Sequence, residues 1–281
     1  MVVRIILSFA LIALIPALAA ADDAPTLEPN ATITLEFPEL PQTLYAMHTE
    51  TEDMTRCTVR LPENYSLERD FPLFVWLNGG AGGNGSSPGR GPAIMEKRDF
   101  IFVGMPLFQE SLDRSTPANG LYITPQDDGE TICHAYQTML EAIYEAVPNI
   151  DTAGNVVGGF SNGGHSIAAI VDTDGDWLLE RFRHIVIVEG ALSMEHGEGL
   201  AGHNVLFLYG GAEDRSEKLV AAFEAVYERL ETGGVNVTRV IMPEIGHAFP
   251  GAFYPTVRDW VREVVGIEAT PEPEVEAAAA E

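Results

Sequence analysis

Basic residues are scarce in this sequence. Lys and Arg number 16 against 42 Asp and Glu, which gives a formal net charge of −26 and a pI near 4.4. Nucleic acids and anionic membrane surfaces are themselves polyanions, so this charge argues against either as a partner. We expect the acidic surface mainly to confer solubility.

Cysteine is almost absent, because Cys57 and Cys133 are the only two among 281 residues. In an oxidising compartment such a pair can form a disulfide bridge. Two buried free thiols are equally compatible with the sequence, since cysteine is a common core residue. Both possibilities stay open at this point.

A long hydrophobic run is also missing. The apolar stretch at residues 5–18 follows Arg4 and is shorter than the about 20 residues that a membrane-spanning helix needs. A run of small residues follows it. Residues 1–21 are therefore predicted to be a secretory signal peptide, cleaved near Ala19 or Ala21. No cysteine near that point could accept a lipid, so we expect a secreted or periplasmic protein without a membrane partner after cleavage.

Strand-like and helix-like segments alternate along the chain. Residues 31–61 are typical of opening antiparallel strands. Short apolar runs typical of buried strands follow at residues 71–77, 100–103, 155–160, 185–188, 205–209 and 237–242, and helical patterns at 131–147, 162–171, 217–231 and 254–265. This alternation predicts an α/β fold with a mostly parallel central sheet covered by helices on both faces. We expect one domain at residues 22–267 and a disordered acidic tail at 268–281.

Ser161 lies within Gly-Gly-Phe-Ser-Asn-Gly-Gly, directly after a predicted strand. A serine on a tight strand-to-helix turn is held in a strained conformation, and Gly159 and Gly163 would remove side chains that clash there. Such a nucleophile elbow exposes the hydroxyl and aims the backbone N–H of Asn162 at a developing oxyanion. The alternative is a glycine-rich turn that happens to contain a serine.

A nucleophilic serine needs a base, and the base needs an acid. His247 follows the last predicted strand, at the sheet edge where ligands bind in open α/β folds. Glu213 and Asp214 follow the strand before it, and either acid could orient the imidazole. We choose Asp214 because its shorter side chain holds a ring more rigidly. Serine, acid and histidine then occur in the order of the α/β-hydrolases.

A second oxyanion donor is expected in the glycine-rich loop after the strand at residues 71–77. Its glycines let backbone amides approach a substrate oxygen closely. We assign the N–H of Gly80 to this role, beside that of Asn162. No metal or organic cofactor is required for such chemistry.

The sequence resembles the α/β-hydrolases, and more closely the small serine carboxylesterases of the polyhydroxybutyrate depolymerase and feruloyl esterase type. The similar segments are Gly-Phe-Ser-Asn-Gly-Gly at 159–164 and Gly-His-Ala-Phe-Pro-Gly at 246–251. Phospholipases and carboxylesterases have a similar serine segment. The resemblance covers roughly residues 70–265. One departure is Asn78, where these families usually have histidine.

These observations predict an exported serine hydrolase of carboxylic esters, with a small-molecule or polymer-linked ester as its substrate. The long polar loop at residues 106–130 is expected to cover the site and shape its pocket. One alternative is a non-catalytic binding protein on the same fold. Another keeps the catalytic residues and changes the bond, giving a peptidase, thioesterase or acyltransferase.

Overall fold

The computed structural model describes residues 25–40, 55–80, 87–107, 129–192, 194 and 197–268. The expected signal peptide, nearly all of the loop predicted to cover the site, and the tail from residue 269 lie outside this description. Within the described part, no helix combines the length and apolar character that crossing a membrane requires.

The described strands form one sheet of eight strands in the order β1-β2-β4-β3-β5-β6-β7-β8. The strands are β1 (Thr32–Glu36), β2 (Arg56–Arg60), β3 (Leu73–Leu77), β4 (Ile101–Gly104), β5 (Val156–Phe160), β6 (His184–Val188), β7 (Asn204–Gly211) and β8 (Asn236–Pro243). The pairs β1·β2 and β2·β4 are antiparallel, and all other neighbours are parallel. The predicted antiparallel start and parallel remainder are confirmed.

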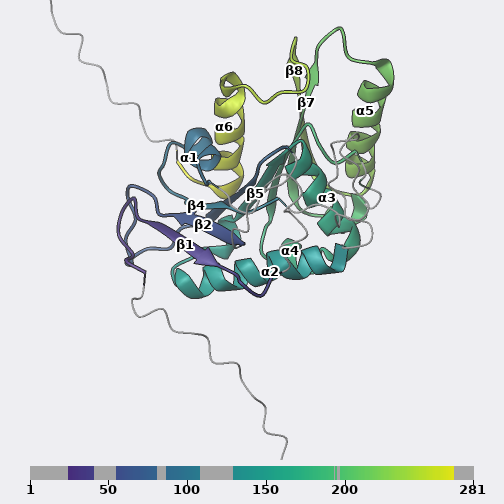
Figure 1. The fold of residues 1–281 in the computed structure, drawn as a ribbon. Helices are drawn as coiled ribbons and strands as arrows, with labels where there is room; N and C mark the ends of the chain where they lie inside the picture. Colours follow the sequence, from purple (N-terminus) through teal and green to yellow (C-terminus); the bar gives the residue numbers. More distant parts are fainter. Residues whose placement is uncertain are drawn as a thin grey trace, which may run out of the picture.

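Helices cover both faces of this sheet (Figure 1). They are α1 (Arg90–Met95), α2 (Gly129–Ala146), α3 (Asn162–Asp174), α4 (Asp176–Leu179), α5 (Glu217–Thr232) and α6 (Tyr254–Val265). Helices α1 and α6 pack on one face, and α2, α3, α4 and α5 on the other. The α/β fold class predicted from the sequence is therefore present.

The central strands are mostly apolar because both of their faces are buried. In β3 the side chains alternate between two cores: Val75 packs with α2 and α3, whereas Phe74 and Trp76 pack with α1 and α6. All five residues of β3 are buried, as are all five of β6. The sheet is thus a rigid support for the loops that follow its strands.

Two short helices, α1 and α4, were not expected from the sequence. Helix α1 lies in a segment rich in glycine and proline, and it is fixed by packing rather than by periodicity. A Cβ on Gly91 would lie 2.8 Å from Cδ1 of Phe102, so the helix backbone sits directly on the sheet. Such close contact is a tertiary effect that a local pattern does not reveal.

Cys57 and Cys133 are both free, and both are buried in the same core. Of the two possibilities left open by the sequence, the structure has the pair of buried thiols. Burial raises the pKa of Cys57 to about 12 and that of Cys133 to about 11, with the charge of Asp174 adding to the second shift. Both groups are therefore protonated at neutral pH and unreactive.

Candidate active site

Ser161 lies in the turn that joins β5 to α3, with φ 53° and ψ −113°. Glycines make this turn possible. A Cβ on Gly159 would lie 2.4 Å from the carbonyl carbon of Gly163, and a Cβ on Gly163 would lie 2.1 Å from the carbonyl oxygen of Leu77. The predicted strand-to-helix turn, strained at its serine and flanked by obligatory glycines, is confirmed.

His247 lies beside this serine. The distance from Ser161 Oγ to His247 Nε2 is 2.8 Å, although 86 residues separate them in the sequence. The ring stacks on Phe160 with centroids 5.4 Å apart, and the N–H of Ala212 donates to the carbonyl of Ile245, which fixes the histidine loop to the end of β7. The side chain of His247 is 56% exposed, so reactants can approach it from solvent.

The carboxylate at the other ring nitrogen belongs to Glu189 and not to the predicted Asp214. Glu189 Oε2 lies 3.0 Å from His247 Nδ1. A carboxylate accepts hydrogen bonds, so this contact assigns the ring proton to Nδ1 and leaves Nε2 as an acceptor for the serine hydroxyl. The structure thus brings together serine, imidazole and carboxylate, with a different acid from the one chosen on the sequence.

Strand length explains why Asp214 does not reach the histidine. The pairing between β6 and β7 ends at Val188 and Leu208, and β7 then continues to Gly211 alongside β8 alone. Glu213 and Asp214 come after this extension and are both exposed. In the turn that follows, the N–H of Arg215 donates to the carbonyl of Ala212, and it is the side chain of Arg215 that returns to the site.

Glu189 follows β6 directly, as Ser161 follows β5, and it too has a positive φ, 55°. Its neighbour Gly190 packs against the elbow: a Cβ there would lie 2.8 Å from both Gly164 Cα and the Ser161 carbonyl oxygen. This close backbone contact holds Glu189 beside Ser161. The sequence did contain a signal, namely a carboxylate and a glycine immediately after a buried strand at the carboxyl edge of the sheet.

The Glu189 side chain is completely buried, yet its charge is well compensated. It accepts hydrogen bonds from the N–H of Gly210 and from both Nη atoms of Arg215, at 2.6 Å and 2.8 Å. Burial alone would raise the pKa of Glu189, but the hydrogen bonds from His247, Arg215 and Gly210 outweigh it and lower that pKa below its ordinary value. Glu189 is therefore ionised at neutral pH.

The two residues expected to supply oxyanion donors are also neighbours. The side-chain amide of Asn162 donates to the carbonyl oxygen of Gly80, which has φ 108°. This bond holds Gly80 against the start of α3, whose first residue follows Ser161 directly in the chain. Only glycine adopts such a φ without strain.

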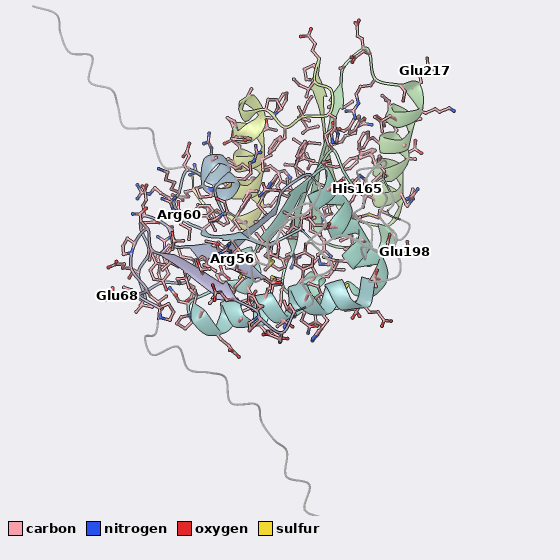
Figure 2. The ribbon with its side chains drawn as sticks, viewed as in Figure 1. Arg56, Arg60, Glu68, His165, Glu198 and Glu217 are labelled. Carbon is pink, nitrogen blue, oxygen red and sulfur yellow. The ribbon has the colours of Figure 1, made fainter. Side chains whose placement is uncertain are left out.

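One further titratable group lies near the histidine. His165, in the first turn of α3 (Figure 2), has its pKa lowered, mainly by burial and secondarily by the charge of His247. It favours the neutral form, so it adds no fixed charge to the site at neutral pH. Among the described residues, no group of three or more His, Cys, Asp or Glu side chains is placed to hold a metal ion.

Comparison with known proteins finds similarity in structure alone. No protein-family model and no curated protein sequence matches the chain. An S-formylglutathione hydrolase from Agrobacterium tumefaciens is similar with a TM-score of 0.57 and 14% identity, over 86% of this chain and 98% of that one. In this chain the parallel sheet order occurs together with a serine elbow after β5. The fold is that of the α/β-hydrolases.

Other similar structures include a fungal esterase from Rhizomucor miehei, with a TM-score of 0.55 and 14% identity over 85% of this chain and 86% of that chain. A putative dipeptidyl aminopeptidase IV from Bacteroides ovatus has a TM-score of 0.56 and 14% identity, and the match covers 84% of this chain but 36% of that one. Esterases and peptidases thus share this α/β-hydrolase fold, which by itself does not select a substrate.

Proposed function

We propose that this protein is an exported serine hydrolase that cleaves carboxylic esters. Ser161 is the nucleophile, His247 the general base, and Glu189 the acid that orients it. The observation that carries the proposal is the continuous contact from Ser161 Oγ to His247 Nε2 and from His247 Nδ1 to Glu189. A serine hydroxyl is activated at neutral pH when it contacts a base that is itself oriented by an acid.

In the proposed reaction the Ser161 hydroxyl attacks the ester carbonyl while His247 Nε2 takes its proton. Glu189, ionised and buried, stabilises the imidazolium that forms and keeps its Nδ1 proton in place. The oxyanion is held by the backbone N–H groups of Gly80 and Asn162, each such donor contributing about a hundredfold to a thousandfold in rate. The imidazolium then protonates the leaving alcohol, and a water molecule hydrolyses the acyl-enzyme with His247 again as base.

Ester cleavage is favoured over peptide cleavage by how completely the chain matches each kind of similar structure. The match spans nearly all of the S-formylglutathione hydrolase chain but about a third of the aminopeptidase chain. The exposed His247 ring is compatible with a small-molecule or a polymer-linked ester. Export rests on the signal peptide predicted at residues 1–21, and N-terminal sequencing of the exported protein tests it.

Turnover of p-nitrophenyl butyrate by the wild type and by Ser161→Ala tests the proposal. The variant is expected to lose at least about a thousandfold in kcat/KM, because no other group replaces the nucleophile. Ser216→Ala is a matched control, since Ser216 is an exposed serine that caps α5. Equal rates for the wild type and Ser161→Ala would refute the proposal that the protein is a serine hydrolase. A panel of thioester, peptide and polyester substrates then identifies the preferred bond.

A further inference from the structure

Arg215 is a buried cation that the proposed reaction does not use directly. Its side chain is 5% exposed, and its guanidinium makes a two-point contact with Glu189, Nη1 to Oε1 at 2.6 Å and Nη2 to Oε2 at 2.8 Å. Nη1 also donates to the carbonyl of Gly210 at 3.0 Å and to that of Gly246 at 3.4 Å. One side chain therefore joins the ends of β6 and β7 to the histidine loop.

We propose that Arg215 is a positioning residue of the active site, which fixes the carboxylate of Glu189 against His247 and sets how readily that pair takes up a proton. This inference rests on the proposed function, because it assigns Arg215 a role in the same reaction. Arg215 acts through Glu189 and touches no reacting atom.

The geometry favours arginine over lysine at this position. A planar guanidinium can contact both carboxylate oxygens and still donate to two carbonyls, whereas an ammonium is a single point charge. A Cβ on Gly210 would lie 2.1 Å from the carbonyl oxygen of Ile245 and 2.4 Å from that of Gly246, so the histidine loop lies directly against β7 beside the guanidinium. The other side of the guanidinium lies over the Phe223 ring of α5, 5.2 Å from its centroid. These contacts leave the guanidinium little freedom to move.

The positive charge of Arg215 affects how readily Glu189 and His247, taken together as a pair, bind a proton. Arg215 contacts Glu189 from the turn after β7, and His165 on α3 is close enough for the charge of His247 to lower its pKa but favours its neutral form. The α5 contact is the apolar ring of Phe223. Arg215 is thus the fixed positive charge that offsets the buried carboxylate, and it disfavours an additional proton on either member of the pair.

The direction of the pH effect follows from this arrangement. Without Arg215, burial again raises the pKa of Glu189, and the carboxylate that remains ionised attracts an imidazolium proton more strongly. Both effects make the pair take up a proton at a higher pH. The reaction needs that proton to be absent, so the acid limb of the kcat/KM profile is expected to move upward.

The test compares kcat/KM between pH 4.5 and 9 for the wild type, Arg215→Met and Arg215→Lys with p-nitrophenyl butyrate. In Arg215→Met the acid limb is expected to move up by about one pH unit. Arg215→Lys keeps the charge and loses the two-point contact, so its limb should stay near that of the wild type while kcat falls. An Arg215→Met acid limb that coincides with the wild-type limb would overturn the proposal.

Arg239→Met is the matched control, because Arg239 also pairs with a carboxylate, Glu224, and lies over an aromatic ring, Tyr227, but on the edge strand β8. The acid limb of the kcat/KM profile of Arg239→Met should coincide with that of the wild type. If it moved as far as the limb of Arg215→Met, a specific role for Arg215 would be refuted.

If the wild type cleaves no ester, NMR titration of the His247 ring in the wild type, Arg215→Lys and Arg215→Met still tests the proposal. The proposal is supported if the ring is protonated at the same pH in the wild type and Arg215→Lys and at a higher pH in Arg215→Met. It is refuted if the protonation midpoint is the same in all three proteins. Failure of the proposed function is thereby separated from failure of this inference.

Discussion

Glu189 and Asp214 are both carboxylates that follow a parallel strand, and their surroundings differ in every respect that matters for orienting a histidine. Glu189 is buried, held by Arg215 and the N–H of Gly210, and in contact with the ring. Asp214 is exposed at the end of an extended strand. A carboxylate fixed by several donors costs little reorganisation when the imidazolium forms, and an exposed one would need to be ordered first.

Exchange of each acid for its amide distinguishes these two residues. Glu189→Gln should lower kcat by about a thousandfold to ten-thousandfold, because the amide no longer stabilises the imidazolium or selects the reactive tautomer. It should also destabilise the fold by about 3 kcal/mol, since Arg215 would be left buried without its counter-charge. Steady-state kinetics and urea unfolding measure the two effects.

Asp214→Asn is the matched control, with activity and stability expected near those of the wild type. The reverse result, in which Asp214→Asn is inactive and Glu189→Gln is not, would return the role to the residue chosen from the sequence. Glu189→Asp is a further comparison, because this variant keeps a carboxylate at the buried position and shortens its side chain. Its activity therefore shows whether a carboxylate at this position is sufficient or whether the length of the glutamate side chain is also required.

The contact between Ser161 and His247 could be predicted because each residue has a local signature. Ser161 is bracketed by glycines that a strained turn requires, and His247 follows the last strand at the expected edge. The carboxylate that contacts His247, Glu189 rather than Asp214, could not be identified in this way, because it depends on how far β7 extends beyond β6. That extension is a property of the pairing with β8, which no single segment encodes.

At the scale of elements, the position of Ser161 depends on the turn between β5 and α3. The backbone of α3 passes so close to the sheet that the carbonyl of Leu77 occupies the place where a side chain of residue 163 would begin. The strand, the turn and the helix are therefore one rigid unit. A change at this contact displaces the serine even though it touches no reacting atom.

Gly163→Ala tests that unit. Its Cβ would lie 2.1 Å from Leu77 O, so either β3 or α3 must move. We expect a loss of about 3 kcal/mol in the free energy of unfolding and a loss of most activity in the fraction that still folds. Gly199→Ala is the control, because the nearest atom to its Cβ would be Val171 Cγ1 at an ordinary 3.7 Å. Similar melting temperatures for the two variants would contradict the tight contact.

Long helices were predictable because their patterns are strong, and short helices were not. Helix α5 has a capping serine and an apolar stripe that includes Phe223 and Val226, so both its existence and its start are visible in the sequence. Helix α1 has six residues and includes glycine and proline. Its position is set by contact with β3 and β4, and by its neighbour α6, rather than by its own sequence.

At the scale of the whole molecule, the two sheet faces bury the apolar residues, whereas most acidic residues that the structure describes lie outside, with Glu189 as a buried exception. Glu68, Glu198 and Glu217 are exposed and lie far apart around the periphery in Figure 2. The formal charge of −26 comes from 42 acidic against 16 basic residues, and these three labelled carboxylates lie well apart on the surface. Folding brings these like charges closer together than they are in the unfolded chain, which opposes folding.

Salt should consequently stabilise this protein at neutral pH. The screening length falls from about 30 Å at 0.01 M salt to about 10 Å at 0.1 M, so repulsion across the molecule is largely removed over that range. We expect the melting temperature at pH 7.5 to rise by about 3–6 °C between 10 and 300 mM KCl, corresponding to about 1–2 kcal/mol.

The same series at pH 5 serves as the comparison. The pI is near 4.4, so the net charge is far smaller at pH 5 and there is less repulsion for salt to screen. The dependence of the melting temperature on KCl should therefore be weaker at pH 5 than at pH 7.5. If the two slopes were equal, salt would be acting through ion exclusion or binding, and the net charge of −26 would not be what limits stability.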